Sequence, residues 1–270
     1  ATSTVTTCTN NMNGSAVINV SALPNTHIVT GGGTYCAGGT GVHVGLNGSD
    51  TGIHYQLYLA SSGVGAPLAG TGSPLDFGFM TAAGTYTVVA LSSSTTCSSN
   101  MTGSAPVIIN PLPVAYTVLG GGNYCIGGTG VHILLSGSNT GIHYQLYRGT
   151  ATVGSPLTGT GAILDFGLQT VAGTYTVVAT NVASGCVNTM TGSVPVVINT
   201  LHIVYTVSGG GNYCTGGTGE HVLLSGSNTG VNYQLYIGGV MAGTPLAGTG
   251  FGLDFGLHTA AGIYTVKATD

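Results

Sequence analysis

The sequence repeats itself with a constant step. The heptapeptide Tyr-Cys-x-Gly-Gly-Thr-Gly begins at Tyr35, Tyr124 and Tyr213, so the step is 89 residues both times (124 − 35 and 213 − 124). Strict self-similarity of this kind marks a tandem array of one structural unit. A unit of roughly 90 residues has the size of an immunoglobulin-like sandwich. Residues that differ by one or two of these steps are called equivalent below.

The boundaries of the units follow from the step. Residues 1–24 correspond to residues 90–113 one step later, because Met12 matches Met101. The array therefore opens in the middle of a unit. The sequence predicts an N-terminal segment with the final strand or strands of a unit, which completes a unit of another copy, then two full repeats and a third repeat that lacks its last strand: residues 1–24, 25–113, 114–202 and 203–270.

Apolar and polar side chains alternate within each repeat. In residues 42–46, Val42, Val44 and Leu46 share one face, which is the period of a half-buried strand. The run Gly31 to Gly33 and the heptapeptide predict a turn and a loop, and Pro67 to Gly72 predicts a loop or short edge strand. The pattern predicts an all-β fold of tandem immunoglobulin-like Greek-key β-sandwiches arranged end to end, with strands in the first repeat at residues 27–29, 42–46, 53–58, 75–79, 84–90 and 107–109.

Charged side chains are rare. Only 3% of the residues are charged, with Lys+Arg 2 and Asp+Glu 6. This composition excludes a basic nucleic-acid footprint and a polybasic membrane patch, and no apolar run reaches the roughly 18 residues of a membrane span. A surface so poor in charge departs from that of a soluble monomer, so we expect neighbouring copies or glycans to cover it.

The cysteines recur in two classes, Cys36, Cys125 and Cys214 in the heptapeptide and Cys8, Cys97 and Cys186 in the final hairpin of a unit. Even, regular use predicts disulfides made in an oxidising, extracellular setting. In a sandwich with alternating strand directions, Cys36 and Cys97 lie at opposite ends of one unit, beyond the Cα separation of roughly 4.4–6.8 Å that a disulfide allows. We therefore favour Cys36 with Cys186 across a junction. The alternative pairs Cys36 with Cys97 and Cys125 with Cys186 inside units.

No catalytic residue, metal site or cofactor is predicted. The recurring histidines, His43, His132 and His221 with His54 and His143, fall on outward faces of different sheets, so we interpret them as solvent or packing residues. Asp76, Asp165 and Asp254 offer one carboxylate per unit, whereas Ca²⁺ takes six to eight oxygens; a turn or strand-end hydrogen bond is expected. Tyr86, Tyr175 and Tyr264 resemble the tyrosine that ties a corner of immunoglobulin sandwiches, which is a structural role.

The whole chain resembles a known family. The cysteine before the second strand, Tyr-Gln-Leu-Tyr at residues 55–58, Ala-Gly-Thr-Tyr-Thr-Val-Val-Ala-Thr at residues 172–180 and the hairpin cysteine are similar to the Ig-like repeats of giant secreted surface proteins of Bacteroidota, adhesin-like proteins associated with gliding and type IX secretion. The resemblance implies an extracellular, cell-surface stalk or adhesive fibre. Repeats that contact glycans or surfaces, with exposed tyrosines such as Tyr58, Tyr147 and Tyr236, are the alternative.

The chain ends predict how copies assemble. A sandwich without its last strand has an unpaired edge and an open groove, and residues 1–24 are the missing piece. We expect another copy to insert this segment by donor-strand complementation, with apolar side chains of Val17, Ile18 and Val20 in the groove. Such a head-to-tail contact propagates a filament. Cys8 would then bond to Cys125 or Cys214 of another copy. The other interpretation is that residues 1–270 are one segment of a longer repeat chain, in which residue 270 is joined by a peptide bond to the next residue 1.

Overall fold

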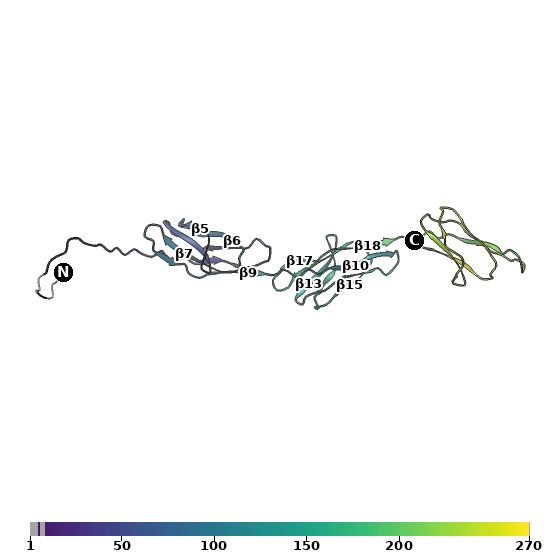
Figure 1. Cartoon of the computed structure of the whole chain (residues 1–270), viewed down its shortest axis with the longest axis horizontal. Helices are drawn as coiled ribbons and strands as arrows, with labels where there is room; N and C mark the ends of the chain where they lie inside the picture. Colours follow the sequence, from purple (N-terminus) through teal and green to yellow (C-terminus); the bar gives the residue numbers. More distant parts are fainter. Residues whose placement is uncertain (1–4, 6–8, 270) are drawn as a thin grey trace. The chain divides into compact units, whose positions relative to one another are not determined.

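The computed structural model describes residue 5 and residues 9–269, and within these residues every regular element is a β-strand. Figure 1 shows the strands gathered into three sandwiches along the sequence. Each sandwich is an immunoglobulin-like arrangement of two sheets, as the alternation of apolar side chains predicts. In the part of the chain that the structure describes, no helix is long and apolar enough to cross a membrane.

The first repeat holds a three-stranded and a six-stranded sheet. The smaller sheet has the order β1-β3-β6, and the larger has the order β2-β9-β7-β4-β5 with β8 paired to β7. All neighbours are antiparallel except β2 and β9, which run parallel. The strands are β1 Val29–Gly31, β2 Gly33–Cys36, β3 Val42–Leu46, β4 Ile53–Leu59, β5 Ser62–Ala69, β6 Leu75–Met80, β7 Gly84–Ser92, β8 Ser98–Asn100 and β9 Ala105–Asn110.

Alternate side chains of these strands form the core. Tyr55 and Leu57 of β4 and Val88 of β7 are fully buried, and they pack with Val44 of β3 and Val107 of β9. The residues between them point outward, as the period of two requires. Burying each such side chain stabilises the fold by roughly 1.5–3 kcal/mol. The interior of the sandwich is therefore the one that the sequence pattern predicts.

Two segments of the first repeat differ from the prediction, and a third decides between its alternatives. The expected loop contains β2, because Gly33–Cys36 pairs with β9. The segment at Pro67, predicted as a loop or short edge strand, is the edge strand: it lies in β5, which has eight residues and tolerates a proline at the sheet edge. The first strand covers Val29–Gly31 instead of residues 27–29, because Val29–Gly31 is the segment that pairs with β3.

The second repeat has the same strand order, β10-β12-β15 and β11-β18-β16-β13-β14 with β17 paired to β16. Its larger sheet again begins with a parallel pair, β11 and β18. The strands are β10 Val118–Gly120, β11 Gly122–Cys125, β12 Val131–Leu135, β13 Ile142–Arg148, β14 Ala151–Thr158, β15 Leu164–Gln169, β16 Gly173–Asn181, β17 Val187–Thr189 and β18 Val194–Asn199.

The third repeat has a smaller second sheet. Its three-stranded sheet β19-β20-β24 matches the first repeat, but its other sheet has four strands, β22-β21-β23 with β25 paired to β21. The segment from Gly211 to Cys214, equivalent to β2 and β11, is not a strand here. The strands are β19 Val207–Gly209, β20 Glu220–Leu224, β21 Asn232–Ile237, β22 Val240–Met241, β23 Leu246–Ala247, β24 Leu253–His258 and β25 Tyr264–Thr269.

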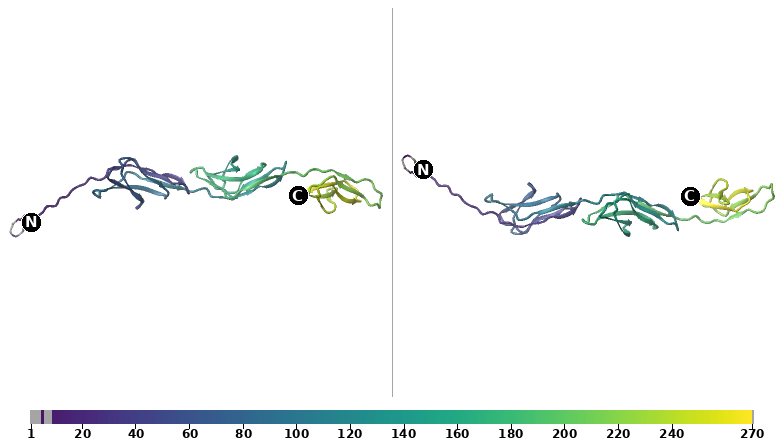
Figure 2. Two further views of the ribbon diagram at one scale, coloured as in Figure 1. Left: turned by 90° about the horizontal axis from the view of Figure 1, so that it is seen from above. Right: turned by 90° about the horizontal axis from the view of Figure 1, so that it is seen from below.

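The described part of the N-terminal segment forms no regular strand. Residues 10–24 carry no strand, and Figure 2 draws them without arrows. Val17, Ile18 and Val20 are almost fully exposed. Exposed apolar side chains clustered in a short stretch indicate a surface that packs against something.

Candidate functional site

A disulfide joins the heptapeptide of the first repeat to the hairpin of the second. Cys36 ends β2 and Cys186 precedes β17, with Cα atoms 5.6 Å apart. This is the junction pairing that the sequence favoured, and it rules out the alternative in which Cys36 bonds Cys97 and Cys125 bonds Cys186. The reason is topological, because the hairpin of a unit and its own heptapeptide lie at opposite ends of the sandwich.

The linker beside this bond is held by side-chain and backbone hydrogen bonds. Asn188 of β17 donates from Nδ2 to the carbonyl of Pro113 at 2.7 Å, which ties the second repeat to the linker in front of it. The carbonyl of Asn110, the last residue of β9, accepts the amide of Ala37 at 2.9 Å. The heptapeptide loop is therefore fixed on the end of β9 next to the disulfide.

The free cysteines that the structure describes have the same local backbone hydrogen bonds as Cys36 and Cys186. In the heptapeptides, the carbonyl of Cys36 accepts from Gly39 at 2.9 Å and the carbonyl of Cys214 accepts from Gly217 at 2.8 Å. In the hairpins, the carbonyl of Cys97 accepts from Ser92 at 2.9 Å, and that of Cys186 accepts from Asn181 at 2.8 Å. Among the described residues, Cys97 is a half-buried free thiol and Cys125 and Cys214 are exposed free thiols. Cys8 lies outside the described residues.

A buried methionine closes each complete repeat. Met101 is 6% exposed and Met190 is 2% exposed, and their sulfurs accept the amides of His27 and Tyr116 at 3.3 and 3.4 Å. Met12, the equivalent residue of the N-terminal segment, is 64% exposed. The sequence shows the three methionines in one register but gives no sign of this contrast.

The third repeat has an open groove where Met101 packs in the first. The groove holds about 340 Å³ and is lined by Tyr205, Val207, Leu224, Tyr233, Val266 and Ala268, among others. The last five are equivalent to Val29, Leu46, Tyr55, Val88 and Ala90, which share one core cluster with Met101. The groove of the third repeat is therefore lined by the same positions that surround Met101 in the first repeat.

A second groove of about 320 Å³ follows the path that β9 takes in the first repeat. Gly211, Asn212 and Tyr213 lie on one rim, and Gly262 and Tyr264 lie on the other. The equivalent rims of the first repeat, in β2 and β7, are the two strands that pair with β9. A Cβ on Gly32 would meet the carbonyl of Pro106 at 2.6 Å, whereas one on the equivalent Gly210 would meet nothing within 4 Å.

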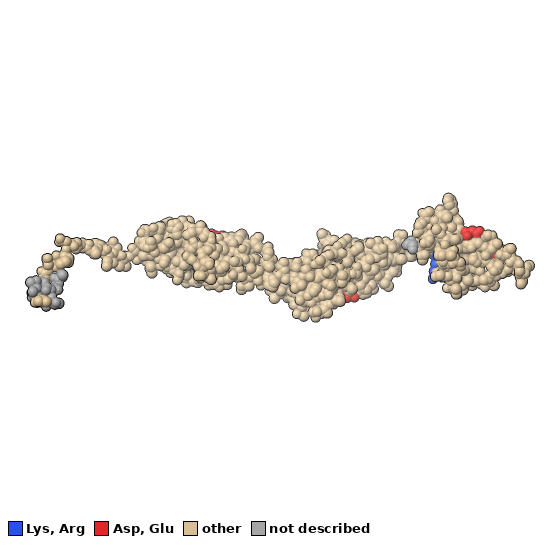
Figure 3. Space-filling view, viewed as in Figure 1, with Lys and Arg blue, Asp and Glu red and all other residues tan. Residues whose placement is uncertain are grey.

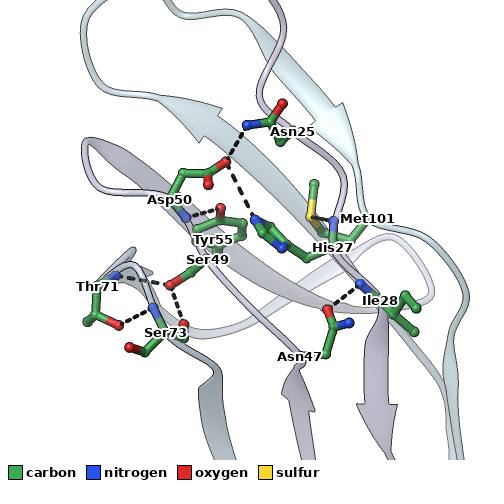
Figure 4. Close-up of polar contacts among 10 residues, drawn as sticks. All are labelled: Asn25, His27, Ile28, Asn47, Ser49, Asp50, Tyr55, Thr71, Ser73 and Met101. Atoms are coloured by element: carbon green, nitrogen blue, oxygen red, sulfur yellow. Dashed lines mark hydrogen bonds and ion pairs between the residues drawn. The ribbon is translucent and has the colours of Figure 1, made fainter.

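A polar cluster covers the start of the first repeat (Figure 4). Asp50 accepts a hydrogen bond from Asn25 at 3.1 Å and faces His27 at 3.5 Å. Its backbone amide donates to the hydroxyl of the buried Tyr55 at 2.9 Å. Burial raises the pKa of Tyr55. In the second repeat Tyr116 donates to Asn139 at 3.1 Å in the place of the His27 and Asp50 pair.

Two of the recurring histidines, which we interpret from the sequence as solvent or packing residues, have carboxylate partners. His43 Nδ1 lies 2.7 Å from Asp76 Oδ2, and His221 Nδ1 lies 2.8 Å from Asp254 Oδ2. Asp76, the second residue of β6, also accepts the amide of Gly78 at 2.8 Å; the sequence predicts a turn or strand-end hydrogen bond for this carboxylate. The hydrogen bond from His43 holds the pKa of Asp76 below its usual value. Among the described residues, no three His, Cys, Asp or Glu side chains gather as a metal site would require.

The tyrosines divide into structural and surface residues. Tyr86 donates to the carbonyl of Ala82 at 3.0 Å and Tyr264 to that of Ala260 at 2.8 Å, so each ties a corner of its sandwich as the resemblance to immunoglobulin domains implies. Their equivalent Tyr175 is buried in the second repeat. The tyrosines that we expected to be exposed for contact with glycans, Tyr58, Tyr147 and Tyr236, are half-buried instead.

Charge is sparse on the face of the molecule drawn in Figure 3, where Asp and Glu appear only at separate places. Lys267 of β25 is one of two basic residues in the chain, and its Nζ lies 5.1 Å from the centre of the Tyr236 ring. Its equivalents in the first two repeats are Val89 and Val178. A lysine on a strand edge discourages unspecific pairing with other chains.

No protein-family model matches the sequence, and no curated protein matches it. Solved structures of tandem immunoglobulin-like and fibronectin-III-like domains are similar. The FN1–FN3 domains of chicken CNTN1 share 10% identity over 91% of this chain and 90% of that chain, with a TM-score of 0.29. The full ectodomain (Ig1–Ig3) of mouse nectin-like molecule 4 shares 13% identity over 88% and 91%, with a TM-score of 0.34.

Proposed function

We propose that this chain is a repeat segment of an extracellular, cell-surface filament, in which the N-terminal segment of one copy completes the third repeat of a neighbour. Tandem immunoglobulin-like sandwiches are consistent with a structural or adhesive repeat, and a disulfide is typical of proteins made in an oxidising compartment. The resemblance of the sequence to surface repeats of Bacteroidota supports the cell-surface part of this proposal. The observation that carries it is the contrast between exposed Met12 and the open methionine groove of the third repeat.

The occupant that we propose for the grooves is residues 9–21 of a second copy. In the first repeat, Val107 of β9 lies opposite Gly33 and Gly84. The equivalent of Val107 is Ile18, which would therefore lie opposite Gly211 and Gly262 on the two rims of the second groove. Met12 would enter the first groove at the same time. One strand thus fits both grooves in the register that the repeat step fixes.

The burial pattern of β9 selects the side chains that face inward. Ala105 and Val107 are buried, whereas Pro106 between them is exposed. The equivalent inward residues of the donated strand are Ala16 and Ile18. Val17 and Val20, which the alternation alone placed in the groove, are equivalent to the exposed Pro106 and Ile109. They would lie on the outer face of the completed sandwich.

Strand addition suits this edge energetically. Backbone hydrogen bonds of the inserted strand satisfy the rims, and alternate apolar side chains give specificity. Ile18 is 89% exposed in the N-terminal segment, so its burial adds roughly 1.5–3 kcal/mol to association. The contact uses different surfaces on the two copies and does not close on itself, so it continues into a filament.

Polymerisation of the full chain tests the proposal. Wild-type protein is expected to form species that grow with concentration in sedimentation velocity and appear as filaments by electron microscopy. Ile18→Asp puts a charge into the groove and is expected to leave monomers. Asn19→Asp is the matched control, because its equivalent Ile108 faces outward, and it is expected to polymerise like the wild type.

Three results would contradict strand donation. The first is a wild-type chain that stays monomeric at every concentration. The second is equal polymerisation of Ile18→Asp and wild type. The third is that a synthetic peptide of residues 9–24 fails to shorten the filaments, because the free peptide should compete for the same grooves. Continuity of the peptide chain from one set of three repeats to the next would show as a mass in denaturing, reducing conditions far above 26.6 kDa.

A further inference from the structure

We infer that copies are sealed by two disulfides at every junction, one between Cys214 and Cys97 of the following copy and one between Cys125 and Cys8 of that copy. The inference rests on the proposed strand donation and adds the covalent chemistry of the same contact. It uses the bond between Cys36 and Cys186 as its template.

The template gives a pairing rule. The heptapeptide cysteine of the first repeat bonds the hairpin cysteine of the second. When a following copy completes the third repeat, its own first repeat becomes the next repeat in line. The rule then assigns Cys214 to Cys97 of the following copy. It assigns Cys125 to Cys8 of that copy, because Cys8 belongs to the hairpin that completes the third repeat.

Strand donation is what brings Cys214 into a bonding position. In the first repeat Cys36 lies on β2, in register with Asn110 of β9. Gly211 to Cys214 is not a strand while its rim is unpaired. A donated strand would place Ser21, the equivalent of Asn110, beside Cys214. The bond between copies is therefore expected to form after the strand is seated.

The backbone around the free thiols already has the conformation that is seen around the bonded cysteines. The hairpin of Cys97 has the same backbone hydrogen bond as that of Cys186, with Thr96 at φ 60° in the place of Gly185 at φ 71°. Cys214 is exposed and Cys97 is half-buried. A non-glycine residue with positive φ is uncommon. That Thr96 adopts a positive φ indicates that the turn before Cys97 has the same geometry as the turn before Cys186.

The chemistry is a thiol–disulfide exchange with a low-molecular-mass disulfide such as oxidised glutathione. The Cys214 thiolate attacks one sulfur of that disulfide, forms a mixed disulfide and releases one thiolate. The Cys97 thiolate of the following copy then attacks the Cys214 sulfur and releases the second. Two protein thiols lose two electrons and two protons in total, and the small disulfide is reduced to two thiols.

Isotope labelling separates bonds between copies from bonds within one. Equal amounts of ¹⁴N and ¹⁵N chains are reduced, mixed, polymerised with oxidised glutathione, and digested without reductant. The expected result is Cys97–Cys214 and Cys8–Cys125 peptide pairs that include one light and one heavy partner. The Cys36–Cys186 pair is expected to carry a single isotope, which makes it the internal control.

Serine variants give the second measurement. Cys97→Ser combined with Cys125→Ser is expected to form filaments by electron microscopy that fall apart to single chains in non-reducing detergent. Cys36→Ser combined with Cys186→Ser is the matched control and is expected to keep a ladder of covalent multimers. Filaments whose Cys97 and Cys214 thiols still react with an alkylating reagent would overturn the disulfides and leave strand donation standing. Absence of filaments in both oxidised and reduced samples would overturn both.

Discussion

At the scale of single residues, the methionine pocket separates stability from assembly. Met101→Ala removes a side chain that is 6% exposed and is expected to destabilise the first repeat by about 2–4 kcal/mol, because the cavity only partly collapses. Met12→Ala removes an exposed side chain and should leave the stability of the monomer unchanged while weakening polymerisation. Hydrogen exchange along β7 and sedimentation of both variants make the comparison. Equal losses of stability would contradict the assignment of the pocket.

The pair of His43 and Asp76 predicts an acid-dependent change. The hydrogen bond from His43 lowers the pKa of Asp76 in the folded protein. A lowered pKa contributes stability that is present above the unfolded value of about 3.9 and is lost as pH falls through the folded value. His43→Ala is expected to move the pKa of Asp76 upward in a carbon-detected NMR titration. An unchanged titration would mean that the amide of Gly78 alone sets this pKa.

Residue-level prediction from the sequence succeeded where a local pattern decides the outcome. The hydrogen bond of Tyr86 follows from its place in the penultimate strand of the predicted repeat, and that of Asp76 follows from its place near the start of a strand. The partnership of His43 with Asp76 could not be predicted, because it depends on the register of β3 against β6. That register shifts between His43 and Gly45, and a period of two says nothing about such an irregularity.

At the scale of elements, two glycines test whether β9 and its donated counterpart use the same space. Gly32→Ala must adopt positive φ and also push its Cβ against the carbonyl of Pro106, so we expect a loss of more than about 1–3 kcal/mol. Gly210→Ala has the same backbone strain but open space around it. Gly210→Ala should destabilise the monomer less than Gly32→Ala does, and it should block polymerisation. Thermal unfolding and sedimentation measure the two effects.

The control for Gly210→Ala is Gly239→Ala, between β22 and β21. Gly239 also has positive φ, and a Cβ there would meet nothing within 4 Å. It lies outside both grooves, so this variant should show similar strain and normal polymerisation. If it assembles as poorly as Gly210→Ala, backbone strain explains the loss and the shared-space argument fails.

One comparison within the chain explains why some strands could not be predicted. The tetrapeptide Gly-Asn-Tyr-Cys is the strand β11 at Gly122–Cys125, but it is not a strand at Gly211 to Cys214. The local sequence is identical, so local preference cannot be the cause. In the second repeat the segment pairs with β18, and the described third repeat offers it no such partner. Strand formation here depends on a partner strand that lies far away in the sequence.

At the scale of the whole molecule, the disulfide adds stability through the unfolded chain. Cys36 and Cys186 are 150 residues apart, and closing a loop of that length is worth about 5 kcal/mol in the chain-entropy treatment. Cys36→Ser combined with Cys186→Ser is therefore expected to lower the midpoint of thermal unfolding and to speed proteolysis of the second repeat. A double variant that unfolds at the wild-type temperature would show that the repeats are stable without the bond.

The same bond decides how a pulling force would travel. Tension that enters at Cys36 can cross the sulfurs to Cys186, so the residues between them bear little of the load. Reduction of the disulfide would place those residues under the force. A separation of 150 residues corresponds to about 500 Å of fully extended backbone. A single chain held under a force that unfolds the repeats should therefore lengthen further when a reductant is added, because only then do the residues between the two cysteines carry the force.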